Sequence, residues 1–81
     1  MPNRDTTRYE LYDGTKKVYI GVTNDLDRRT DEHKAEPLRF SRVNKVGPEV
    51  TRDSALDWER DALDTYQGNH DGKLPRGNNR G

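Results

Sequence analysis

The chain has 81 residues, of which 27% are hydrophobic and 37% charged, and its formal net charge is zero. A chain of this length forms one small domain that buries roughly 60–65% of its unfolded surface, so its core is thin. The absence of cysteine excludes disulfides and thiolate zinc sites. No apolar run is long enough for a signal peptide or a transmembrane helix, so we expect a cytoplasmic protein without a membrane partner.

Residues 1–7 are polar, and we expect them to be flexible. Two strands follow, at 8–12 and 17–22, because both segments are rich in Tyr, Val and Ile and the intervening Asp13-Gly14 pair is a hairpin signal. Gly21, near the end of the second strand, has no side chain. A ligand or another backbone can therefore approach closely at that position.

The next segment predicts a helix that runs to about Glu36, with Thr23-Asn24 as its N-cap. At roughly 100° per residue, Leu26, Arg29 and His33 fall on one face of this helix. The only large apolar residue of the helix thus shares its face with an arginine and a histidine. A solvated helix face would show the same residues, so this pattern alone does not establish a site.

A second short helix is predicted to begin at Pro37 and to end at Gly47-Pro48. Val50-Thr51 is then the candidate for a short third strand. The apolar residues of the short helix would be Leu38, Phe40, Val43 and Val46.

The clearest helix spans about 55–67, capped by Asp53 or Ser54, and its apolar residues recur at i, i+3, i+4 and i+7. Glu59 lies within this apolar stripe. Burial of an unpaired carboxylate costs several kcal/mol, so Glu59 requires a cationic partner or a metal ion. Tyr66 is assigned to the same stripe.

These elements predict an α+β domain over residues 8–79. A small sheet, made of the hairpin and a short third strand, packs with two to three helices in the order β-β-α-(α)-β-α. After the last helix, His70 is assigned to a loop and Leu74-Pro75 is expected to dock on the domain. Residues 80–81 are expected to be flexible.

Five residues in order and spacing resemble the GIY-YIG nuclease family over nearly the whole chain. Tyr19-Ile20-Gly21 matches the second half of the family signature, whereas Thr7-Arg8-Tyr9 keeps only the tyrosine of the first half. Arg29 follows ten positions after the second tyrosine, and His33 follows Arg29 by four. The helical Glu59 comes later, as it does in the family.

The resemblance implies a DNA endonuclease that hydrolyses phosphodiester bonds with Mg²⁺ or Mn²⁺ and has little intrinsic sequence specificity. It makes Glu59 the metal ligand, and Arg29 the group that steadies the scissile phosphate. Tyr9 would act on the base side of the reaction, and Tyr19 would position the water or the phosphate. His33 would relay the proton or bind a phosphate.

Basic residues concentrate in the middle of the chain, although the net charge is zero. They can form a basic face for phosphate groups, although a solvated surface would have the same composition. Arg39, Arg42 and Lys45 are equally open candidates for a further basic residue that some family members carry. The mid-chain basic residues are Arg28, Arg29, Lys34, Arg39, Arg42 and Lys45, and the expected DNA contacts are Arg28, Arg39, Arg42, Lys45 and Asn78.

Several alternatives stay open at this point. Either Asn78 or Asn79 corresponds to the asparagine that often closes the family domain. A catalytically weak or inactive nucleic-acid-binding module of the same fold would carry much of the same sequence. A homodimer is compatible with the chain, as are roles in repair, in phages or mobile elements, in restriction and in toxicity.

Overall fold

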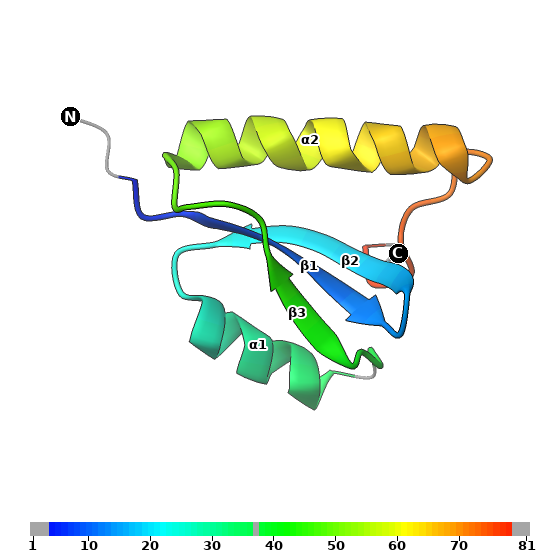
Figure 1. The fold of residues 1–81 in the computed structure, drawn as a ribbon, viewed down its shortest axis with the longest axis horizontal. Helices are drawn as coiled ribbons and strands as arrows, with labels where there is room; N and C mark the ends of the chain where they lie inside the picture. Colours follow the sequence, from blue (N-terminus) through cyan, green and yellow to red (C-terminus); the bar gives the residue numbers. More distant parts are fainter. Residues whose placement is uncertain (1–3, 37, 79–81) are drawn as a thin grey trace.

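The computed structural model describes residues 4–36 and 38–78, which form a three-stranded antiparallel sheet and two helices (Figure 1). In chain order these are β1 (Thr7–Asp13), β2 (Lys16–Thr23), α1 (Leu26–Ala35), β3 (Arg42–Lys45) and α2 (Arg52–Asn69). This order confirms the predicted α+β class.

The first strand begins one residue earlier than predicted. β1 begins at Thr7 instead of residue 8, and Thr6 before it forms a bridge with Val50. The predictions for residues 1–3 and 79–81 lie outside the described residues.

The hairpin of β1 and β2 places both tyrosines of the predicted site on one face of the sheet. Gly14 in its turn has a φ of +67°, which glycine adopts without strain. Tyr9 lies opposite Gly21, and Leu11 lies opposite Tyr19. Directly opposite residues share a face, as do residues two apart on one strand, so the two tyrosines point to the same side.

β3 pairs with β1 on the side away from β2, so the strand order is β2-β1-β3. The prediction of a short helix in this region and of a third strand near Val50 was wrong. Pairing with the open edge of β1 satisfies backbone hydrogen bonds, and this outweighs the helix-like spacing of Val43 and Val46. Val50 forms only an isolated bridge, and Pro37, the predicted start of the helix, lies outside the described residues.

Each helix begins after a side chain that accepts a hydrogen bond from a free backbone amide. The Asp25 carboxylate accepts from the amide of Arg28 at 3.1 Å, and the Thr51 hydroxyl accepts from the amide of Ser54 at 3.3 Å. In both caps the acceptor precedes the amide by three residues, which makes Asp25 and Thr51 the N-cap residues. The predicted caps, Thr23-Asn24 and Asp53 or Ser54, were therefore wrong by one to three residues.

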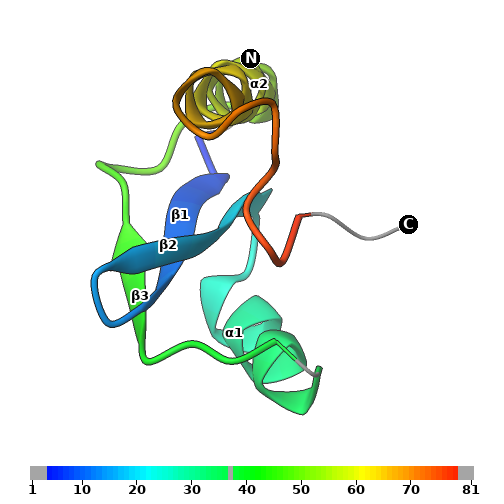
Figure 2. The ribbon, with the colours of Figure 1, turned by 90° about the vertical axis from the view of Figure 1, so that its right-hand side faces the viewer.

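The sheet separates the two helices, with α1 on one side and α2 on the other (Figures 1 and 2). On the α2 side Ile20 and Ala55 are fully buried. Among residues 4–36 and 38–78, no helix combines the length and apolar character needed to cross a membrane. The core on the α1 side consists of buried Tyr9, Leu11 and Val18, packed against Tyr19, Leu26, Leu38, Phe40 and Val43.

The segment after α2 returns to the outer edge of β2. The Gly77 amide donates to the Val18 carbonyl at 2.6 Å. The Asn78 side chain accepts from the amide of Ile20 and donates to its carbonyl, both at 2.8 Å. Pro75 is fully buried, as the predicted docking of this segment requires. The segment after α2 thus binds the outer edge of β2 at Val18 and Ile20.

Candidate functional site

Four of the five predicted catalytic residues come together on the α1 side of the sheet. Tyr9 comes from β1, Tyr19 from β2, and Arg29 and His33 from α1. The Tyr9 hydroxyl and His33 Nε2 are hydrogen-bonded at 2.8 Å. The ring centroids of Tyr19 and His33 are 4.5 Å apart, and those of the two tyrosines are 5.8 Å apart. We call these four residues the Tyr9 cluster.

Arg29 supplies the positive charge of the Tyr9 cluster. Its side chain is 33% exposed and forms an ion pair with Glu32 at 3.0 Å. Its hydrogen-bonding interaction with Tyr19, followed by those with Glu32 and Tyr9, raises the pKa of Arg29 above its ordinary value. A guanidinium that stays charged at the solvent boundary is a suitable group for binding phosphate oxygens.

The two tyrosines differ in burial. Tyr9 is fully buried, and burial raises the pKa of its hydroxyl well above the ordinary value, to which the nearby Tyr19 adds. The interaction of Tyr9 with Arg29 lowers this pKa, but by less than burial and Tyr19 raise it. Tyr19 is only half-buried. Ionisation of Tyr9 is therefore disfavoured, and Tyr19 is the more accessible of the pair.

Gly21 makes room for both rings. A Cβ at this position would lie 3.0 Å from Cζ and from the hydroxyl of Tyr9, and it would overlap the ring of Tyr19. The close approach that the sequence predicted at Gly21 is thus made by the two tyrosines.

Glu36 extends the Tyr9 cluster through a contact that the sequence analysis missed. His33 is fully buried, and its Nδ1 lies 3.6 Å from Oε2 of Glu36. Because Nε2 of the same ring binds Tyr9, the imidazole joins a buried phenol to a half-buried carboxylate. The available signal was the i, i+3 spacing of His33 and Glu36, which brings side chains together on a helix.

Glu59 lies apart from the Tyr9 cluster. It is on α2, one turn after the buried Ala55, and it faces the sheet from the other side. Burial raises the pKa of its carboxyl group. Within residues 4–36 and 38–78, Glu59 forms no hydrogen bond or ion pair, so the cation that its position calls for is not supplied by this part of the chain.

The predicted DNA contacts differ in how their side chains are engaged. Arg28 and Arg39 are exposed. The Arg42 guanidinium lies 4.2 Å from the centroid of the Tyr12 ring, and Lys45 forms an ion pair with Glu49. Both polar atoms of the Asn78 side chain are used by Ile20, which gives Asn78 a structural role, whereas Asn79 lies outside the described residues.

Glu59 fits a Mg²⁺ ion that is held together with water and substrate. In the described ranges, no three His, Cys, Asp or Glu side chains form a group that could hold a metal ion. Mg²⁺ is commonly bound by one or two carboxylates, with waters and phosphate oxygens as its other ligands. A half-buried carboxylate without a cationic partner is consistent with that mode of binding.

No protein-family model matches the chain, and comparisons with curated proteins and with solved structures found no significant match. The resemblance to the GIY-YIG family therefore depends on the five residues and their spacing alone.

Proposed function

We propose that the chain is a divalent-metal-dependent DNA endonuclease that hydrolyses phosphodiester bonds with little sequence specificity. The observation that carries this proposal is the Tyr9 cluster, in which three separate elements bring two phenols, a guanidinium and an imidazole together. These groups can bind a phosphate and move a proton, as hydrolysis of a phosphodiester requires.

Arg29 binds the scissile phosphate in this proposal. Its fork of N–H donors can hold two phosphate oxygens at once, and part of its side chain faces solvent. The competing partner is Glu32, an exposed carboxylate whose ion pair with Arg29 contributes little to stability. A phosphate can therefore displace Glu32 at low cost.

The burial of Tyr9 supports a different division of roles from the one expected from the sequence. We assign Tyr19 the role of positioning the attacking water, because it is the more accessible tyrosine and interacts with Arg29. Tyr9 and His33 form a buried hydrogen-bonded pair behind it, which fixes the imidazole and can share a proton. Glu36 lies on the other side of this ring, with Oε2 3.6 Å from Nδ1.

Glu59 would hold the metal ion. When bound, Mg²⁺ would polarise the phosphate and stabilise the charge that develops on the leaving oxygen.

One observation favours a second candidate, a nucleic-acid-binding module without catalytic activity. Glu59 forms no hydrogen bond or ion pair with the Tyr9 cluster within the part of the chain that the structure describes. Such a protein would bind DNA through its cations and leave it intact.

A plasmid cleavage assay separates these two candidates. We expect the full chain to nick supercoiled DNA with Mg²⁺ or Mn²⁺ but not with EDTA. We expect Glu59→Gln to lower the nicking rate by at least about a hundredfold. Gln keeps the volume of Glu59, so circular dichroism should show an unchanged fold. The matched control is Asp61→Asn, which removes a charge from the exposed face of the same helix.

Two results would count against parts of this proposal. DNA binding without cleavage under any of these ions supports the binding module. Cleavage by Glu59→Gln at the wild-type rate excludes Glu59 as the metal ligand.

A further inference from the structure

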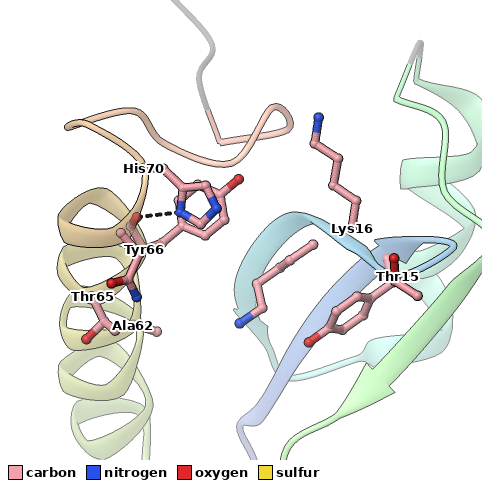
Figure 3. Close-up of a pocket in the computed structure, with 9 residues that line it drawn as sticks. Thr15, Lys16, Ala62, Thr65, Tyr66 and His70 are labelled. Carbon is pink, nitrogen blue, oxygen red and sulfur yellow. Dashed lines mark hydrogen bonds between the residues drawn. The ribbon is translucent and has the colours of Figure 1, made fainter.

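A groove runs between the β1–β2 turn and the C-terminal end of α2, away from the Tyr9 cluster. Two cavities, of about 490 and 900 Å³, share Lys16, Tyr66, Asn69 and His70 in their walls. Figure 3 shows Tyr66 and His70 on the helix side and Lys16 across from them on the hairpin. We call these two joined cavities the α2-end groove; none of the Tyr9 cluster or Glu59 lines it.

A stacked pair of rings forms one wall of the α2-end groove. The rings of Tyr66 and His70 are 3.7 Å apart by centroid and only 8° from parallel. His70 Nδ1 donates a hydrogen bond to the Tyr66 carbonyl at 2.7 Å, which holds the imidazole in place. Tyr66 is half-buried and His70 is exposed, so the pair presents a rigid aromatic surface to solvent.

Positive charge surrounds this aromatic pair. The ammonium groups of Lys16 and Lys73 form no hydrogen bond or ion pair within residues 4–36 and 38–78, and both residues line the groove. Arg76 also lines it, and uses one nitrogen to donate to the Arg39 carbonyl at 3.1 Å. Asp71 is the one acidic residue in the walls of the two cavities.

We propose that the α2-end groove binds an unpaired nucleotide of a DNA strand. The base would stack on the Tyr66–His70 pair, and the flanking phosphates would lie near Lys16 and Lys73. Aromatic platforms between cations are a general solution for single-stranded nucleic acid, and the smaller cavity lies within the roughly 300–1,000 Å³ range of ligand pockets. That the bound strand is DNA rests on the proposed function. That the groove takes a base next to a phosphate rests on the groove's own residues.

Fluorescence anisotropy with two labelled single strands of equal length and charge tests this proposal. One is an oligothymidylate, and the other has abasic sites throughout. Binding is measured in EDTA, where cleavage does not interfere. We expect the full chain to bind the oligothymidylate at least about fivefold more tightly than the abasic strand, since one stacked base contributes that much.

Variants of His70 connect this preference to the groove. His70→Ala should reduce the preference to near unity, whereas His70→Phe, which keeps a ring for stacking, should retain it. Lys16→Ala should weaken binding of both strands equally, because it removes a phosphate contact. The matched control is Lys34→Ala, because Lys34 is an exposed lysine on α1 outside the groove. It should weaken the binding of either strand less than Lys16→Ala does.

Equal affinity for the two strands, or a wild-type preference in His70→Ala, would overturn the proposal. A last experiment adds thymidine monophosphate to the protein and follows its binding through the NMR signals of the His70 ring. If the mononucleotide shifts these signals and the strand does not, the ligand is a free nucleotide and the proposed strand site is wrong. Plasmid cleavage by His70→Ala is measured separately, so failure of the groove and failure of the nuclease give different results.

Discussion

Gly21 sets how closely the two tyrosines of the Tyr9 cluster pack. Its φ is not in the left-handed region, so the strand backbone accepts an L-residue there. The constraint comes from the rings, which occupy the space of a side chain on the α1 face of β2. An added methyl group must move Tyr19, whose ring also packs on His33.

Gly21→Ala should therefore destabilise the protein and disturb the cluster. Overpacking of this kind costs about 1–3 kcal/mol, and the entropic gain from replacing a strand glycine returns only about 0.5–1 kcal/mol. We expect a net loss of about 1–2 kcal/mol in the free energy of urea unfolding, with a changed near-UV tyrosine signal.

Gly68→Ala is the control for this change. Gly68 lies in α2 and has nothing within 4 Å of an added Cβ. Alanine should raise the free energy of unfolding there by up to about 1 kcal/mol. If Gly21→Ala stabilises the protein as Gly68→Ala does, the rings do not fill the space beside Gly21.

Sequence spacing predicted the convergence of the Tyr9 cluster well. The hairpin register and the one-turn interval between Arg29 and His33 follow from strand and helix periodicity. The position of Glu59 could not be predicted in the same way, because it depends on which side of the sheet α2 packs. The stacking of Tyr66 on His70 was also missed, since His70 is the C-cap, just beyond the last helical residue of α2.

At the scale of elements, Glu10 ties the three strands together. Its side chain is on the middle strand β1, and it forms an ion pair with Lys17 of β2 at 2.8 Å. It also accepts hydrogen bonds from Asn44 of β3 and from the Tyr12 hydroxyl, both at 3.1 Å. Burial alone would raise the pKa of Glu10, but these partners outweigh it and lower the pKa below its ordinary value.

The stability of the sheet should therefore depend on pH through Glu10. Because its pKa is lower in the folded state, its contribution is complete above the ordinary carboxyl pKa of about 4.3 and is lost as the pH falls through the folded value. We expect Glu10→Gln to lower the free energy of unfolding by about 1–2 kcal/mol near neutral pH. This difference from wild type should shrink in acid.

Urea titrations at several pH values measure this effect. The matched control is Glu49→Gln, which breaks the exposed ion pair with Lys45 and should change stability little at any pH. A difference between wild type and Glu10→Gln that stays constant from neutral pH into acid would show that the charge of Glu10 does not stabilise the sheet.

β3 shows why element predictions failed in one place. Its four residues are mostly polar, and only Val43 carries a sizeable apolar side chain. Such a short edge strand has no distinctive period of its own, and the open edge of β1 decides its conformation. The hairpin and α2 were easier to predict, because turn residues and a long apolar stripe specify them locally.

The size of the whole molecule limits the length of duplex DNA that it can contact. Its principal extents are 39 × 28 × 24 Å, and one helical turn of duplex DNA is roughly 34–36 Å. The protein can thus cover about one turn. Its cations are spread between α1, β3 and the α2-end groove, where they suit phosphates better than base edges.

Affinity for duplex DNA should consequently be governed by salt and little by sequence. The zero net charge does not prevent this, since each phosphate neutralised by a nearby cation releases counterions. With about three such contacts, the association constant should fall roughly 40-fold between 50 and 200 mM salt. Two unrelated duplexes of equal length should bind within a few-fold of each other. Anisotropy titrations in EDTA measure both quantities, and a salt-independent affinity or a single strongly preferred duplex would show that base contacts, not phosphates, hold the DNA.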